Sequence, residues 1–387
     1  MKKRRAFIIV LDGFGIGEAP DAADFGDVGS NTLKSVWQTG KLDIPNLIKM
    51  GLGNIDGVDF MPNAKEPIAS FARMKERSAG KDSTVGHWEI AGHVSSFPLP
   101  TFSDGFPKEF LERFSLAIGR DVLCNKTYSG TAVIEDYGDE HIRTGSPIVY
   151  TSADSVFQIA AHTDIIPLEE LYSICKKARE MLCGEALGVG RVIARPFTYG
   201  KGDEKFVRTA DRRDFSLEPP CKLLADEVLG AGQRSVAIGK INDLFAGRGF
   251  TDIYPTHSNE EVMENILNVA NKEFNGLCFA NLVDFDTLWG HRRDSEKYAD
   301  GLNKFDAWLL SLLELLDEND LLVITSDHGC DPGFVKTTDH TREYTPLLSY
   351  VKGRAPLNYG TRESFADIGV TVAKWLSVDF SGDGTAI

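Results

Sequence analysis

The sequence lacks the features of a membrane, exported or disulfide-linked protein. No apolar run approaches the roughly 20 residues needed to span a bilayer. The run at residues 6–11 ends at Asp12, and no cleavage site follows it. The six cysteines are scattered and include no Cys-x-x-Cys pair. Such cysteines are typical of reduced thiols, which predicts a cytoplasmic protein without a disulfide framework or a zinc knot.

The sequence is also short of positive charge. It has 42 Lys and Arg residues against 57 Asp and Glu residues, a net charge of −15. Because nucleic acids and anionic membranes attract clustered Lys and Arg, we expect neither as a partner. An anionic ligand would need a local positive pocket. The rest of the composition, 42% hydrophobic and 26% charged over 387 residues, predicts a globular protein with two domains or one domain carrying an insertion.

Four short apolar runs are typical of strands buried on both faces. They span residues 6–11, 235–239, 277–283 and 321–325. Each run leads into polar or charged residues, among them Asp12, Lys240, Asp286 and Asp327. Since ligands of open α/β sheets bind outside the carboxyl ends of parallel strands, these residues are expected to share one site.

Helical patterns follow some of these runs. After Asp294, a candidate N-cap, apolar residues recur at steps of four and three from Tyr298 to Leu316. A second stripe runs from Phe365 to Trp375. Strands that alternate with such helices predict an α/β fold with a doubly wound, mostly parallel sheet.

The middle of the chain forms a separate αβ-like stretch. It has strand candidates at 147–152 and 190–197 and a helix near 168–182, and Pro- and Gly-rich breaks flank it. The strand-end residues above fall on both sides of it. We therefore expect a core domain in two segments, 1–99 and 218–387, with a cap domain inserted at 100–217.

Three carboxylates and three imidazoles form a candidate metal-ligand set: Asp12, Asp286, Asp327, His291, His328 and His340. Taken singly, such an aspartate is more often a cap or turn residue, and such a histidine a surface or hydrogen-bonded one. Together they offer the mixed oxygen and nitrogen ligands of two first-row divalent ions. Imidazole disfavours Mg²⁺ alone, and the absence of cysteine disfavours structural zinc. Two metals about 3.5–4 Å apart recur in phosphoryl chemistry.

Thr84 lies in the stretch GKDSTVGHWE (80–89), where a helix is expected to begin near Val85. Its hydroxyl could be the N-cap, although the reciprocal Thr-x-x-Glu box is absent because residue 87 is a histidine. Alternatively, a helix N-terminus favours a phosphate, and a metal-activated hydroxyl could attack phosphorus. The residues alone leave both roles open.

Six motifs, in order along nearly the whole chain, resemble those of bacterial phosphopentomutases of the alkaline phosphatase superfamily. They are VLDGFGIGEAPDA (10–22), GKDSTVGHWE (80–89), YTSADSVFQIAAH (150–162), VDFDTLWGHRRD (283–294), TSDHGCDP (325–332) and TDHTREYTP (338–346). The resemblance implies an alkaline-phosphatase-like core with an inserted α/β cap. It also implies an isomerase that uses two Mn²⁺ ions to interconvert ribose 1-phosphate and ribose 5-phosphate, and their 2-deoxy forms.

The resemblance further implies roles for single residues. Thr84 would carry the phosphoryl group as a phosphothreonine, primed by a sugar bisphosphate activator. One metal would be held by Asp12, Thr84, Asp327 and His328, and the other by Asp286, His291 and His340. The substrate contacts would be Ser152, Asp154, Arg195 and Arg208 in the cap and Lys240 in the core. The rival functions are a metal-dependent phosphatase or phosphodiesterase on the same core, and a non-catalytic sugar-phosphate-binding protein.

Overall fold

A computed structural model describes residues 3–152, 155–202 and 204–387, and it divides into two compact units. The first unit comprises Met1–Pro98 and Pro219–Ile387, and the second comprises Leu99–Glu218. The predicted boundaries, after residues 99 and 217, each lie one residue from these. The function of the second unit as a cap stays a prediction.

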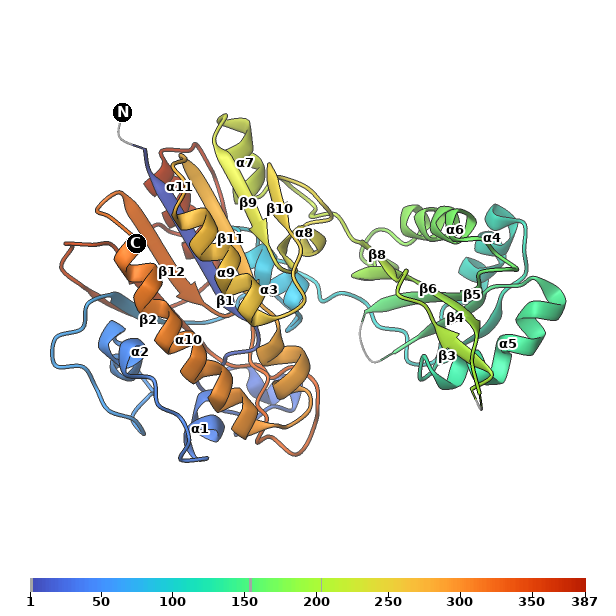
Figure 1. Ribbon diagram of the computed structural model, residues 1–387, viewed down its shortest axis with the longest axis horizontal. Helices are drawn as coiled ribbons and strands as arrows, with labels where there is room; N and C mark the ends of the chain where they lie inside the picture. Colours follow the sequence, from blue (N-terminus) through green and yellow to red (C-terminus); the bar gives the residue numbers. More distant parts are fainter. Residues whose placement is uncertain (1–2, 153–154, 203) are drawn as a thin grey trace. The chain divides into compact units, whose positions relative to one another are not determined.

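An eight-stranded sheet forms the centre of the first unit (Figure 1). The strand order is β10-β9-β11-β1-β12-β13-β2-β14, and only the pairs β12/β13 and β13/β2 are antiparallel. The strands are β1 (Arg5–Leu11), β2 (Ser70–Met74), β9 (Arg234–Ile238), β10 (Asp252–Tyr254), β11 (Gly276–Leu282), β12 (Asp320–Thr325), β13 (Thr345–Tyr350) and β14 (Asn358–Arg362). The prediction of a mostly parallel sheet is confirmed.

The four apolar runs of the sequence are the adjacent parallel strands β9, β11, β1 and β12. Leu11 of β1 lies opposite Leu282 of β11, and Val10 lies opposite Thr325 of β12. Every residue of β1 after Arg5 is buried. Such strands are continuous apolar runs because helices cover both faces of the sheet. Their carboxyl ends meet at one edge.

Helices pack on each face of this sheet (Figure 1). One group consists of α1 (Thr32–Trp37), α2 (Pro45–Met50), α9 (Asn259–Ala270) and α10 (Ser295–Leu315). The first three helices contact α10, and the group shares a core with alternate residues of β1, including Phe7, Ile9 and Leu11. The other group consists of α3 (Ser83–Ile90), α7 (Leu224–Gly230), α8 (Ile241–Leu244) and α11 (Ala366–Leu376). Short helical turns complete the unit at η1 (Ala22–Phe25), η2 (Leu52–Asn54) and η3 (Phe285–Gly290).

The start of α10 agrees with the sequence pattern. Asp294 is its N-cap, and its side chain accepts a hydrogen bond from the backbone N–H of Lys297 at 3.0 Å. Among the described residues, no helix is both long enough and apolar enough to cross a bilayer.

The second unit has its own six-stranded sheet and its own core. The strand order is β3-β4-β5-β6-β7, and β8 pairs with β6. Aromatic residues such as Phe114, Phe157 and Phe197 fill its two apolar clusters. Its elements are α4 (Lys108–Ile118), β3 (Leu123–Thr127), α5 (Ala132–Thr144), β4 (Ile148–Thr151), β5 (Val156–His162), α6 (Leu168–Met181), β6 (Arg191–Tyr199), β7 (Phe206–Arg208) and β8 (Arg213–Ser216).

Candidate metal and phosphate site

Three buried carboxylates meet at the carboxyl edge of the large sheet. Asp12 directly follows β1, Asp286 lies in η3 just after β11, and Asp327 comes two residues after β12. Because these three strands are parallel neighbours, their following residues converge. The structure therefore brings together the aspartates that the sequence analysis grouped.

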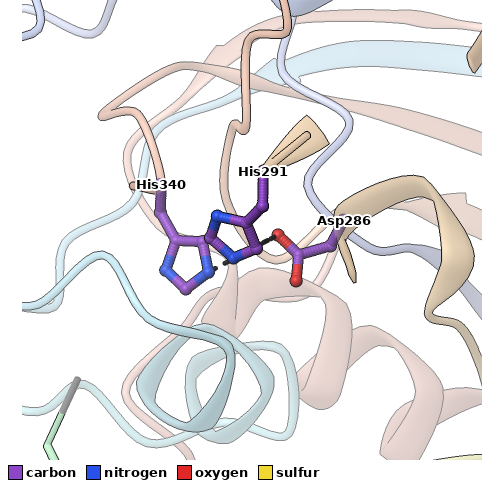
Figure 2. A group of neighbouring side chains, drawn as sticks. All are labelled: Asp286, His291 and His340. Atoms are coloured by element: carbon purple, nitrogen blue, oxygen red, sulfur yellow. Dashed lines mark ion pairs between the residues drawn. The ribbon is translucent and has the colours of Figure 1, made fainter. Parts of the chain in front are cut away.

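A π-helical turn positions the next two ligand candidates. In η3, the backbone N–H of His291 donates to the carbonyl of Asp286 at 3.0 Å, a bond that spans five residues. This turn places His291 Nε2 3.3 Å from Asp286 Oδ1. His340 approaches the same oxygen from a separate loop, with its Nε2 at 3.5 Å (Figure 2). Single π-helical turns are rare and often occur at functional sites.

His328 extends this cluster toward β1. Its Nε2 lies 3.4 Å from Asp12 Oδ1 and 3.2 Å from Asp327 Oδ2. Its ring centre is 4.0 Å from that of His340. Possible ligand atoms of two groups lie within 4.8 Å of one another: Asp286, His291 and His340 in one, and Asp12, Asp286 and His328 in the other. Asp286 is common to both groups, whereas the sequence analysis assigned it to one ion.

Backbone carbonyls orient two of these imidazoles. Nδ1 of His291 lies 2.5 Å from the carbonyl of Thr338, and Nδ1 of His328 lies 3.1 Å from that of Gly329. Since a carbonyl oxygen only accepts, Nδ1 carries the proton in each ring and Nε2 is directed toward the carboxylates. This arrangement is typical of histidines that bind metals.

The donor set fits divalent cations. One oxygen of each central carboxylate is buried and has no hydrogen-bond partner among the described residues: Asp12 Oδ1, Asp286 Oδ1 and Asp327 Oδ2. Buried polar atoms are nearly always paired, because an unpaired one loses its hydration without compensation. Oxygen atoms of this kind, together with imidazole nitrogens, are ligands for first-row divalent ions.

The pKa shifts show how strongly these charges interact. Burial raises the pKa of Asp12, and the neighbouring Asp327 raises it further, to about 6. Burial lowers the pKa of His291, but its close ion pair with Asp286 outweighs this effect and raises the pKa to about 9. The cluster thus holds protons that bound cations would displace.

The N-cap of α3 is Asp82, so the interpretation of Thr84 as the N-cap is wrong. The helix begins at Ser83, and Asp82 Oδ1 accepts hydrogen bonds from the backbone N–H groups of Thr84 at 2.9 Å and Val85 at 3.2 Å. No described residue forms a hydrogen bond with the Thr84 hydroxyl. Thr84 therefore lies in the first turn of the helix without serving as its cap.

This first turn of α3 lies against the metal-ligand cluster. Ser83 Oγ is 3.1 Å from His328 Nε2. Lys240, at the start of α8, places Nζ 3.3 Å from Ser83 Oγ and 3.8 Å from Asp12 Oδ2. A Cβ atom on Gly86 would lie 2.3 Å from the carbonyl oxygen of Asp327, so this close approach requires glycine.

Two buried residues that the sequence analysis did not select hold this arrangement together. His87 Nδ1 lies 2.7 Å from the carbonyl of Ser83 and 3.1 Å from Asp327 Oδ2. The amide of Asn281 lies 3.1 Å from His87 Nε2 and donates to Asp12 Oδ2 at 3.0 Å. The available signals were a histidine in the GKDSTVGHWE motif and a polar residue inside an apolar strand.

The second unit gathers positive side chains around Tyr150. Arg195 donates to Gln158 Oε1 at 3.0 Å, and Arg208 donates to the carbonyl of Gly130 at 3.1 Å. The Tyr150 hydroxyl is buried without a hydrogen-bond partner among the described residues. Burial raises the pKa of Tyr150, and the charges of Arg195, Arg208 and Arg212 oppose that rise. The sequence analysis did not select Arg212 or Tyr150.

Only glycine fits at residue 130, beside Arg208 and Tyr150. A Cβ atom there would lie 2.3 Å from Arg208 Nη2 and 2.8 Å from the Tyr150 hydroxyl. Of the other predicted substrate contacts in this unit, Ser152 directly follows β4, the strand that carries Tyr150. Asp154 lies outside the described residues.

Comparisons with known proteins relate the chain to metal-dependent enzymes. A model of the metalloenzyme superfamily matches residues 4–380. A phosphopentomutase of Lachnoclostridium phytofermentans is 53% identical over 379 residues, which cover 97% of this chain and 96% of that protein. A phosphopentomutase of Acetivibrio thermocellus is 50% identical over 383 residues, covering 98% of each.

A solved structure supports the fold alone. The PH0037 protein of Pyrococcus horikoshii aligns with 98% of this chain and 99% of its own, with a TM-score of 0.51 and 14% identity. Together with the superfamily match, this similarity confirms the predicted alkaline-phosphatase-like α/β fold.

Proposed function

The chain belongs to the metalloenzyme superfamily and, within it, to the phosphopentomutases, and from this premise we propose that it interconverts ribose 1-phosphate and ribose 5-phosphate. The proposal includes their 2-deoxy forms, a phosphothreonine at Thr84, two Mn²⁺ ions and priming by a sugar bisphosphate. The enzyme is an isomerase of the phosphoryl-transferring kind.

The observation that carries this proposal is the cluster of buried carboxylate oxygens without hydrogen-bond partners at the sheet edge. We infer that Asp12, Asp327 and His328, with the Thr84 oxygen, hold one ion. Asp286, His291 and His340 hold the other. The membership of Asp286 in both groups supports two ions close together. When bound, the ions would supply positive charge to the oxygens of the transferring phosphoryl group.

Thr84 carries the phosphoryl group in this mechanism. A pentose monophosphate presents its free hydroxyl to phosphothreonine, and the bond from phosphorus to Thr84 Oγ1 breaks as a bond to the sugar oxygen forms. The resulting bisphosphate returns its other phosphoryl group to Thr84, which leaves the isomeric monophosphate. The first turn of α3 supports this role, because its backbone N–H groups and dipole favour a phosphate. Lys240 adds a positive charge beside that turn.

In this proposal, residues of the second unit bind the substrate phosphate. Arg195 and Arg208 offer planar donor groups that match phosphate oxygens. The buried Tyr150 hydroxyl beside them supports the same role, since it has no partner among the described residues. Ser152 and Asp154 complete the contacts to the sugar phosphate in this proposal.

One assay separates this function from its rivals. The protein is incubated with ribose 5-phosphate, Mn²⁺ and a catalytic amount of a sugar bisphosphate, and the products are followed by phosphorus NMR. We expect ribose 1-phosphate in equilibrium with the substrate. Free phosphate as the main product would indicate a phosphatase. Binding of ribose 5-phosphate without any conversion would indicate a non-catalytic sugar-phosphate-binding protein.

A further inference from the structure

The first unit contains a cavity of about 350 Å³ at the edge of the large sheet opposite the metal-ligand cluster. Its lining includes Arg4, which precedes β1, and Leu321, near the start of β12. Asp12 and Asp327 follow the other ends of the same two strands. The seven residues of β1, at about 3.3 Å each, separate the two sites by roughly 20 Å. The proposed mechanism makes no use of this cavity.

Positive charge is concentrated on the cavity wall. Arg4, Arg354 and Lys374 line it, and the lining includes no Asp or Glu. None of the three forms an ion pair with an acidic residue among those described. Two positive charges remain even if a terminal carboxylate on Ile387, which also lines the cavity, is counted. In a chain of net charge −15, such a group of unpaired cations would be stabilised by an anionic ligand.

Trp375, near the end of α11, holds two of these cations in place. The guanidinium carbon of Arg4 lies 5.1 Å from the centre of its ring, and that of Arg354 lies 4.8 Å from it. Arg4 Nη1 also donates to the carbonyl of Trp375 at 3.0 Å. The ring itself is fixed, because its Nε1 donates to the carbonyl of Arg5 at 2.9 Å. Both guanidinium groups are thus positioned before any ligand binds, which lowers the entropy lost on binding.

We propose that this cavity binds a phosphorylated small molecule. Guanidinium and ammonium groups are the side chains that bind phosphate, and each retains donors that no described acidic residue uses. Hydroxyl groups of Ser349 and Tyr359 on the wall could accept or donate to a sugar or to water. The volume lies at the lower end of the range of about 300–1,000 Å³ that is usual for small-molecule sites. The ligand is therefore of sugar-phosphate size.

The test uses the manganese-loaded protein and fructose 1,6-bisphosphate as the probe. Tryptophan fluorescence is titrated at constant ionic strength, and Trp375→Phe shows which part of the signal reports on this cavity. We expect saturable binding that the double variant Arg354→Gln, Lys374→Gln weakens by about tenfold or more, the loss expected for charged hydrogen bonds. The matched control is Lys65→Gln, an exposed lysine outside the lining, which should bind as the parent does.

Two results would overturn this proposal. One is a dissociation constant that the double variant leaves unchanged. The other is loss of the fluorescence change in Arg208→Ala, which would place the probe in the proposed substrate site instead. Mutase turnover should be the same in the parent, the double variant and Lys65→Gln. If the probe does not bind this cavity, the proposed mutase function is unaffected. If the mutase assay fails, the proposal for this cavity is unaffected.

Discussion

Replacing Thr84 by valine should abolish turnover while leaving the stability of the protein nearly unchanged. No described residue forms a hydrogen bond with the Thr84 hydroxyl, and valine keeps both the shape and the branched side chain. We therefore expect the free energy of unfolding to change by no more than about 0.5 kcal/mol. Loss of the phosphoryl carrier should lower kcat by at least about 10⁴-fold. Thr84→Ser keeps the oxygen and should retain measurable activity.

Asp82→Ala is the matched variant, because it removes the N-cap and keeps the Thr84 hydroxyl. It deletes the acceptor of two backbone N–H groups, at 2.9 and 3.2 Å. Such a loss costs about 0.5–2 kcal/mol of stability. Asp82→Asn can still cap the helix and should recover most of that stability.

The two variants are compared by denaturant unfolding, by manganese content and by conversion of ribose 5-phosphate. We expect Thr84→Val to be stable, to bind metal and to be inactive, whereas Asp82→Ala is less stable and still turns over. A Thr84→Val protein that isomerises pentose phosphates would refute the reasoning. So would a Thr84→Val protein that loses as much stability as Asp82→Ala, because the hydroxyl would then have a structural role.

Three further predictions concern the surrounding groups. His87→Phe removes a buried imidazole that donates to the Ser83 carbonyl and lies 3.1 Å from Asp327 Oδ2, and it should cost about 1–3 kcal/mol of stability in the metal-free protein. Equilibrium dialysis should also show weaker manganese binding, and an unchanged affinity would argue against a positioning role. Arg208→Ala should lower kcat/KM by about 10- to 100-fold with metal content intact. Arg143→Ala, which changes an exposed arginine of the same unit, should leave kcat/KM unchanged. Equal effects of the two substitutions would contradict a contact between Arg208 and the substrate phosphate. The pKa of Asp12 is raised to about 6, and a protonated carboxyl group does not bind cations. The affinity of the metal-free protein for manganese should therefore fall as the pH drops through about 6. Equilibrium dialysis that shows no pH dependence would count against Asp12 as a ligand.

The carboxylates of the site could be predicted from the sequence because their positions follow from local patterns. An apolar run with an aspartate just after it defines both a buried strand and its carboxyl end, as at Asp12. Parallel neighbours then bring Asp286 and Asp327 to the same edge. This inference needs no knowledge of side-chain packing.

Other parts of the site depend on contacts between distant segments. His87 and Asn281 are 194 residues apart in the chain, and nothing near either residue signals their contact. The start of α3 was misplaced because three successive residues, Asp82, Ser83 and Thr84, are each good N-cap residues. Packing of Gly86 on the backbone of Asp327 fixes the helix where the sequence alone could not.

The measurement that tests the central claim most directly is mass spectrometry of the protein after incubation with a sugar bisphosphate and Mn²⁺. Trypsin should release residues 82–108, a peptide that contains Thr84 and five other hydroxyl residues, Ser83, Ser95, Ser96, Thr101 and Ser103. Fragmentation should place a phosphoryl group on Thr84, and addition of excess ribose 5-phosphate should remove it as ribose bisphosphate forms. A protein that interconverts pentose phosphates while this peptide stays unmodified, or carries the phosphoryl group on another residue, would contradict the account.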